Sequence, residues 1–162
     1  MSTVTTINPS TGNPIETYIR LKQTQVNSYI EEANKTFQIW KNKSYDERAK
    51  LMNALADIFD ERNEEYAQLA TKEMGKTIVQ SRKEIEKCAK ICRYYAGHTS
   101  ELLADETVET EAIKSYVAFQ PLGVILAVMP WNFPFYQVIR FLAPALMAGN
   151  TGVLKHASNV QG

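Results

Sequence analysis

The sequence predicts an α/β fold in which a β-hairpin and several helices lead into the first βαβ unit of a parallel sheet. Three features support this: turn residues near the N-terminus, helical spacing of apolar residues over 24–103, and two β-branched segments around a later helix. Two parallel strands are too few for a stable sheet covered on both faces. We therefore expect an incomplete sheet, formed by the N-terminal part of a longer architecture.

The N-terminal segment is expected to form a hairpin from about Val4 to Leu21. Asn8-Pro9 and Gly12-Asn13-Pro14 are turn signals between short extended stretches. A helix is expected to follow from Thr24, which is placed to cap it, to about Lys41, because apolar residues recur there at helical spacing.

Two further helical stretches have recognisable ends. Ser44 and Glu47 have the capping-box spacing, in which each side chain satisfies a free backbone donor of the other. Asn63 is placed to cap a further helix, and Gly75 is placed to close it. A long amphipathic helix is then expected over 77–103.

The cysteines and histidines give no metal or disulfide signal. Cys88 and Cys92 lie four residues apart in the long helix, where a disulfide is awkward. His98 and His156 are too few and too scattered for a metal site. We expect two buried thiols, no metal, and no catalytic role for either histidine.

The C-terminal part changes to strand patterns. Alternating apolar and polar residues over 113–119 predict a half-exposed strand whose edges can pair with another subunit. The apolar run 123–130 predicts a strand covered on both faces. A helix over 135–148, interrupted by Pro144, and a second strand over 151–157 complete a βαβ unit.

Composition limits the possible partners. Eighteen basic and eighteen acidic side chains cancel without long blocks of one sign, so bulk charge attracts neither nucleic acid nor an anionic membrane. The start of the chain lacks the apolar segment of a secretory signal, and there is no 18-residue apolar run. We expect a cytoplasmic protein whose partner is a small molecule or another protein.

Functional groups in parallel sheets gather at the carboxyl ends of the strands. In this chain those ends are Pro130 to Phe133 and Lys155 to Ser158. The turn Gln120–Gly123, where helices give way to the βαβ unit, is the expected boundary between an N-terminal region, 1–120, and a second region, 121–162.

Four sequence blocks carry a family resemblance: PLGV at 121–124, PWNFP at 130–134, ALMAGN at 145–150 and GVLKHA at 152–157. In this order and spacing they resemble the aldehyde dehydrogenase superfamily. The resemblance covers essentially the whole chain and implies the N-terminal third of that fold, ending in the first βαβ unit of a Rossmann-type sheet. It implies that region 121–162 is the start of an NAD(P)-binding domain, a nucleotide-binding domain that continues beyond Gly162. The last segment, KHASNVQG, resembles a bacterial succinate-semialdehyde dehydrogenase subgroup.

The resemblance implies an NAD- or NADP-dependent oxidation of an aldehyde to an acid, with succinate semialdehyde as the expected substrate. In the family a cysteine thiolate attacks the aldehyde, hydride passes to the nicotinamide, and a glutamate helps water to hydrolyse the thioester. The resemblance also implies that this catalytic cysteine and this glutamate lie beyond Gly162, so neither Cys88 nor Cys92 is the nucleophile. The isolated chain is expected to be inactive.

Asn132 is the expected oxyanion donor. Negative charge develops on the former carbonyl oxygen, and a neutral amide at a strand end can donate a hydrogen bond to it. Pro130 and Trp131 are expected beside the cofactor together with Asn132, and Phe133 beside the substrate. The alternative is that Asn132 only caps the following helix.

Lys155 and Ser158 are expected to contact the cofactor. The Lys155 ammonium can donate to ribose hydroxyls, and Ser158 stands where many family members carry an acid that repels a 2′-phosphate. Arg140 lies about 12 Å along a straight helix from Asn132 and can lean back to hold a substrate carboxylate. The alternative for Lys155 is that it is only a surface lysine, and the alternative for Arg140 is that it pairs with an acidic neighbour.

Two other functions remain open at this point. The chain could be a non-catalytic interaction or oligomerisation module, or a relic of the family, with strand 113–119 as its edge. A generic nucleotide-binding domain is less favoured, because no Gly-x-Gly-x-x-Gly follows a strand. The intact protein is expected to be a homo-oligomer, a dimer or a tetramer.

Overall fold

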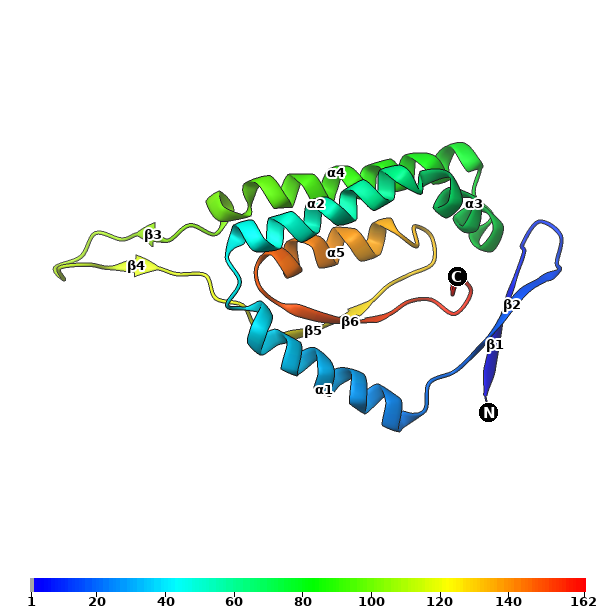
Figure 1. Cartoon of the computed structure of the whole chain (residues 1–162), viewed down its shortest axis with the longest axis horizontal. Helices are drawn as coiled ribbons and strands as arrows, with labels where there is room; N and C mark the ends of the chain where they lie inside the picture. Colours follow the sequence, from blue (N-terminus) through cyan, green and yellow to red (C-terminus); the bar gives the residue numbers. More distant parts are fainter. Residues whose placement is uncertain (1) are drawn as a thin grey trace.

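The computed structural model describes residues 2–162. Strands β1 (Thr3–Ile7) and β2 (Pro14–Ile19) form the predicted antiparallel hairpin at one end of the molecule (Figure 1). Its turn reaches the turn after α3, where a Cβ added at Gly75 would lie 2.7 Å from the Cγ of Pro9. Gly75 has φ 86°, a left-handed conformation that favours glycine.

Five helices form most of the body, and α2, α4 and α5 pack together on one side of the C-terminal strands (Figure 1). Helix α1 lies on the other side of these strands and contains no buried residue. No helix within residues 2–162 is long and apolar enough to cross a membrane. The helices are α1 (Gln23–Trp40), α2 (Tyr45–Glu61), α3 (Asn63–Met74), α4 (Ile78–Leu102) and α5 (Tyr136–Met147).

The predicted helix ends are partly confirmed. Ser44 Oγ accepts from the Glu47 backbone at 3.2 Å, and the Glu47 carboxylate accepts from the Ser44 backbone at 2.8 Å. Two predicted caps are wrong. Thr24 lies inside α1, because the residue before the helix is Lys22. The Gln25 side chain accepts a hydrogen bond from the Lys22 backbone amide. Asn63 is the first residue of α3 and instead donates to the Arg82 carbonyl of α4 at 3.2 Å.

The C-terminal unit is the predicted βαβ arrangement. Strands β5 (Val124–Val128) and β6 (Thr151–Lys155) pair in parallel and are joined by α5. Gly152 packs against Leu142 of α5, whereas the Thr151 hydroxyl donates to the Ala33 carbonyl of α1 at 2.9 Å. Successive residues of β6 therefore face opposite helices, and the strand pair lies between them.

The expectation of a strand covered on both faces holds only in part for β5. Ala127 is buried, but Leu126 and Val128 are 65% and 62% exposed. These two side chains alternate with Ala127 and therefore point away from it, to the α1 side. Helix α1 covers only part of that face, and β5 pairs with no strand other than β6 within residues 2–162.

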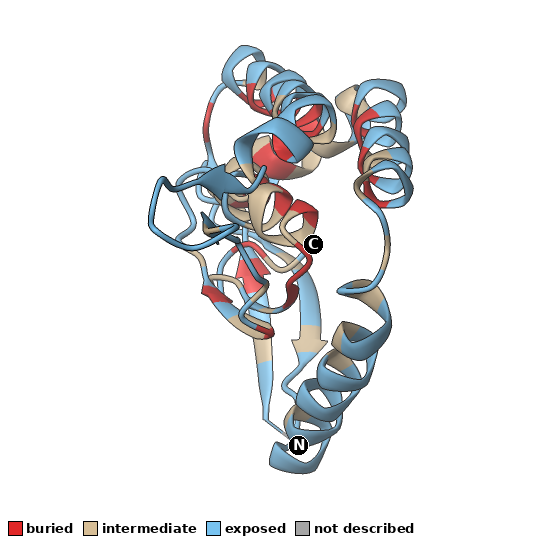
Figure 2. Cartoon of the chain, turned by 90° about the vertical axis from the view of Figure 1, so that its left-hand side faces the viewer, coloured by how far each residue is buried: buried red, intermediate tan, exposed pale blue. Residues whose placement is uncertain are grey.

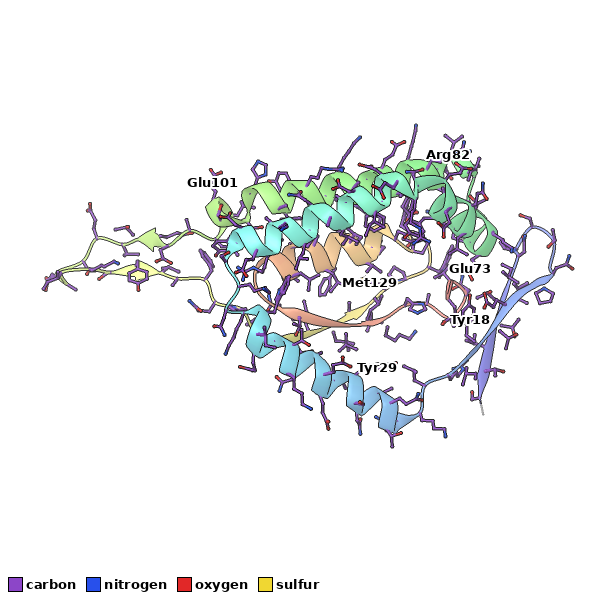
Figure 3. All side chains as sticks on the ribbon, in the orientation of Figure 1. Tyr18, Tyr29, Glu73, Arg82, Glu101 and Met129 are labelled. Carbon is purple, nitrogen blue, oxygen red and sulfur yellow. The ribbon has the colours of Figure 1, made fainter. Side chains whose placement is uncertain are left out.

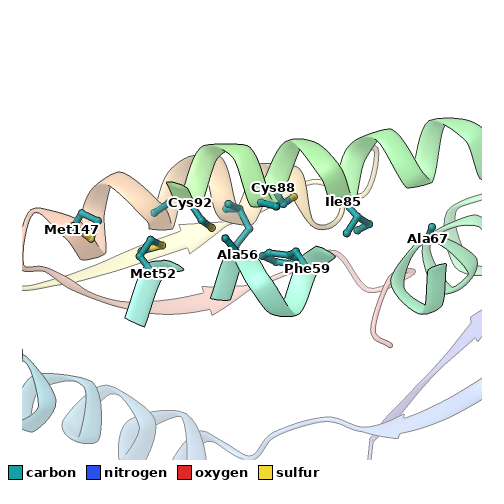
Figure 4. Close-up of a cluster of buried hydrophobic side chains, with 11 residues drawn as sticks. Met52, Ala56, Phe59, Ala67, Ile85, Cys88, Cys92 and Met147 are labelled. Carbon is teal, nitrogen blue, oxygen red and sulfur yellow. The ribbon is translucent and has the colours of Figure 1, made fainter. Parts of the chain in front are cut away.

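One apolar cluster joins the helices (Figure 4). Helices α2, α4 and α5 contain buried residues, whereas the residues of α1 are intermediate or exposed (Figure 2). The cluster crosses the expected division between 1–120 and 121–162, and that division stays a prediction. The cluster contains Met52, Ala56, Phe59, Ala67, Ile85, Cys88, Ala89, Cys92, Ile139, Ala143 and Met147.

A long two-stranded arm projects from the body between α4 and β5 (Figure 1). It contains β3 (Glu106–Thr107), which was not predicted, paired with β4 (Tyr116–Val117). The strand expected over 113–119 is shorter than predicted, because Ile113 is fully exposed and lies outside the paired residues.

Candidate functional site

The carboxyl end of β5 leads through residues 129–135 into α5, and this loop borders a hollow of about 440 Å³. Asn132 is exposed at its edge, and the opposite wall comes from the turn after α3 and from α4. The hollow is lined by Met74, Lys76, Gln80, Lys83, Glu84, Lys87, Trp131, Asn132, Phe133 and Tyr136. It therefore brings together three predicted site residues, Trp131, Asn132 and Phe133.

The side-chain amide of Asn132 makes no hydrogen bond within residues 2–162. Helix α5 is capped instead by Glu84 of α4, whose Oε1 accepts from the backbone amides of Phe135 and Tyr136 at 2.9 Å each. Capping by Asn132 is therefore not observed. Its amide stays available to donate into the hollow.

Glu84 belongs to a buried ion pair that was not predicted from the sequence. Its other oxygen accepts from the Lys76 ammonium, and the two side chains are 0% and 4% exposed. The same ammonium lies 4.2 Å from the ring centroid of Phe133, so it also contacts the loop. One signal was present in the sequence, because Glu84 lies on the face of α4 that carries Cys88. A carboxylate there needs a partner.

Aromatic contacts hold the loop against the helices. The Phe135 ring packs against Tyr66 and Phe59, with centroids 5.3 Å and 6.4 Å away. Phe133 instead packs against Tyr136, at 6.1 Å, on the side of the hollow. Phe135 thus anchors the loop in the core, whereas Phe133 is 44% exposed and forms part of the wall.

Lys155 and Ser158 lie at and just beyond the carboxyl end of β6, and both are exposed. Lys155 forms no ion pair in the described part of the chain. The loop that follows is held by Glu73 of α3, whose two oxygens accept from the Gly162 backbone at 3.3 and 3.1 Å. Glu73 is buried and points toward the hairpin and the C-terminal loop (Figure 3).

Arg140 is not in the same hollow as Asn132. It is exposed on α5, forms no ion pair among residues 2–162, and borders a second hollow of about 430 Å³ near the end of α4. Tyr136 lies one helical turn earlier on the same face and lines the Asn132 hollow. Arg140 is therefore adjacent to that hollow without lining it.

Neither cysteine is suited to be a nucleophile. Cys88 and Cys92 are 0% exposed in the apolar cluster. Burial raises the pKa of the Cys88 thiol, with a further contribution from the nearby Glu84 carboxylate, and raises the pKa of Cys92 to about 11. A reactive cysteine needs a lowered pKa and access to substrate. No metal-binding cluster of His, Cys, Asp and Glu occurs within residues 2–162.

The sequence profile of the aldehyde dehydrogenase family matches residues 1–161. The chain belongs to the aldehyde dehydrogenase family. It is 54% identical over 157 residues to a probable succinate-semialdehyde dehydrogenase [NADP(+)] of Synechocystis, and 48% identical over 160 residues to a succinate-semialdehyde dehydrogenase [NADP(+)] of Mycobacterium leprae. Each match covers 97% of this chain and 35% of the relative.

Solved structures of the aldehyde dehydrogenase family have the same fold. Succinic semialdehyde dehydrogenase of Streptococcus pyogenes, in complex with NADP+, superposes with a TM-score of 0.93 at 35% identity, covering 97% of this chain and 35% of that one. An aldehyde dehydrogenase of Brucella melitensis gives 0.93 at 28% identity, covering 98% and 33%. These likenesses confirm the predicted fold class. The chain spans about a third of the length of these proteins.

Proposed function

We propose that this chain is the N-terminal part of an NADP- or NAD-dependent aldehyde dehydrogenase that oxidises succinate semialdehyde to succinate. The observation that carries the proposal is the free amide of Asn132, which lies beside a hollow at the carboxyl end of β5 in a chain of this family. The named relatives support the substrate. The nucleophilic cysteine and the glutamate base are expected outside these residues, so the isolated chain should not oxidise aldehydes.

Asn132 is proposed to stabilise the negative charge that develops on the former carbonyl oxygen. A donor held in place before the reaction stabilises this charge without reorganising, and losing one such donor costs about 100- to 1,000-fold in kcat. Asn132→Ala in the intact protein should reduce kcat by that factor. Asn53→Ala, which removes an exposed amide from α2, is the control and should leave kcat unchanged. Equal kcat values for both variants would remove Asn132 from the chemistry.

The cofactor is proposed to contact Lys155 and Ser158, and the nicotinamide supplies the hydride acceptor. Both side chains are exposed at the carboxyl end of β6, and Lys155 has no ion-pair partner in residues 2–162. A cation and a neutral hydroxyl fit a 2′-phosphate, in agreement with the NADP+ named for the relatives. Ser158→Glu should lower the preference for NADP over NAD, since it adds a like charge. Ser100→Glu, at the far end of α4, is the control.

Arg140 is proposed to bind the carboxylate of succinate semialdehyde, by leaning back toward Tyr136 and the Asn132 hollow. The hollow contains competing lysines, of which Lys87 contacts Tyr136, with its ammonium 4.3 Å from the ring centroid. Arg140→Ala should lower kcat/KM for succinate semialdehyde about 10- to 100-fold more than for an uncharged aldehyde of similar length. A selective loss in Lys87→Ala instead would assign the carboxylate to Lys87.

The arm that contains β3 and β4 is proposed to mediate homo-oligomerisation. The arm projects from the body (Figure 1). It carries three large apolar side chains that are each more than 40% exposed, Val108, Tyr116 and Val117. Exposed strand edges favour pairing with another chain. Val117→Lys should lower the oligomeric state of the intact protein in light scattering, and an unchanged mass would exclude the arm as the main contact.

A further inference from the structure

We propose that Glu84 is a positioning residue for catalysis, which fixes the loop between β5 and α5 so that the Asn132 amide is held at the edge of the hollow. The inference rests on the proposed oxyanion role of Asn132. Glu84 itself touches no reacting atom in this proposal and acts through the loop.

The first support is the way the loop ends. No residue of the loop caps α5 with its side chain, so its first backbone amides need an acceptor from elsewhere. Glu84 Oε1 supplies it at 2.9 Å to both Phe135 and Tyr136. A carboxylate at a helix N-terminus is also favoured by the helix dipole. The helical end of the loop is therefore fixed by a side chain from α4.

The second support is the anchoring of Glu84. Its side chain is fully buried, and the adjacent Ile85 and the next-turn Cys88 are 0% exposed in the apolar cluster. Moving Glu84 would require moving α4 against α2 and α5. The carboxylate is thus fixed relative to the core, and it fixes the loop relative to the core in turn. An exposed carboxylate would be mobile and would not fix the loop.

The third support is the second oxygen of Glu84. It holds the Lys76 ammonium, which lies 4.2 Å from the centroid of Phe133, the residue next to Asn132. The loop is therefore contacted beyond Asn132 by a cation–π interaction and at α5 by two hydrogen bonds. Glu84 accepts both hydrogen bonds and also holds the Lys76 ammonium that makes the cation–π contact. Because the Asn132 side chain has no partner within residues 2–162, these contacts set its position.

The test is a double-mutant cycle on kcat in the intact enzyme with succinate semialdehyde and NADP. Glu84→Ala should lower kcat about a hundredfold, the scale expected when a reacting group is misplaced by about 1 Å. In an Asn132→Ala background, the same change should lower kcat less than threefold, since two residues that act as one unit are not additive. A merely structural Glu84 would give similar losses in both backgrounds and would overturn the inference.

Two further variants serve as controls for the cycle. Glu86→Ala removes an exposed carboxylate from the same helix and should leave kcat unchanged. If Glu84→Ala does not fold, Glu84→Gln keeps an Oε1 acceptor for both amides, and its smaller loss of kcat should also vanish in the Asn132→Ala background. Persistence of that loss would refute the inference. If Asn132→Ala itself leaves kcat unchanged, the proposed function fails; if only the Glu84 variants do, the positioning role fails alone.

Discussion

Asn150 offers the sharpest test of how the βαβ unit is held together. It is buried between α5 and β6, and its Oδ1 accepts from the backbone amides of Leu122 and Gly123 at 2.7 and 3.1 Å. Its Nδ2 donates to the Ala145 carbonyl at 3.1 Å. One side chain therefore joins the start of β5 to the end of α5. It thereby helps to set the register of the two strands whose carboxyl ends carry the candidate site.

Asn150→Ala removes all three hydrogen bonds and leaves the Gly123 amide buried without an acceptor. The unpaired buried amide costs about 1–3 kcal/mol and each of the other two bonds contributes about 0.5–1.5 kcal/mol, so we expect the free energy of unfolding to fall by about 4 kcal/mol. Asn150→Asp keeps both accepted bonds but cannot donate to Ala145, and should cost less. Urea denaturation of the intact protein measures both free energies.

Hydrogen exchange measures whether the loss of stability arises at the start of β5, where Asn150 accepts its two hydrogen bonds. The amides of Leu122 and Gly123 should exchange faster in Asn150→Ala and remain protected in Asn150→Asp, because only the former lacks the oxygen acceptor. A loss below about 1 kcal/mol in Asn150→Ala, or unchanged exchange at both amides, would refute this account of the strand start.

Three other predictions follow from local contacts. The buried Cys88 thiol, whose pKa is raised mainly by burial, should resist alkylation at pH 8 in the folded protein and react only in denaturant, as read by mass spectrometry. Gly75→Ala should cost at least about 1 kcal/mol in urea denaturation, because φ is 86° and a Cβ would lie 2.7 Å from a proline ring. Hydrogen bonding from Arg82 lowers the pKa of Glu64 to about 2. Since this is below the unfolded value, the contact stabilises the fold above about pH 4.5 and is lost toward pH 2; Arg82→Ala should return the NMR-measured pKa toward 4.5.

Much of the fold was predictable because its signals are local. Ser44 and Glu47 satisfy each other within one helical turn, and Gly75 ends α3 through its own backbone conformation. The β-branched runs on either side of α5 predicted the parallel pair, since a strand–helix–strand order has few alternatives. The family motifs then placed Asn132 at a strand end, where the structure shows it beside a hollow.

The contacts that hold the site were not predictable from local pattern. Glu84 lies 51 positions from Phe135, and Glu73 lies 89 positions from Gly162, so no short-range spacing relates either pair. Thr24 and Asn63 were wrongly predicted as caps. Both are good capping residues, but Gln25 and the carbonyl of Arg82 provided other hydrogen bonds at those ends.

The two buried carboxylates show why the helices matter to the strand ends. Glu73 precedes the turn at Gly75 and accepts from the backbone of Gly162 beyond β6, whereas Glu84 follows that turn and accepts from Phe135 beyond β5. A single helix–turn–helix therefore contacts both loops that carry the proposed oxyanion and cofactor residues. Any shift of α3 relative to α4 would change the distance between these loops. Substitutions that alter this turn are thus expected to affect the candidate site as a whole, even though they lie far from it in sequence.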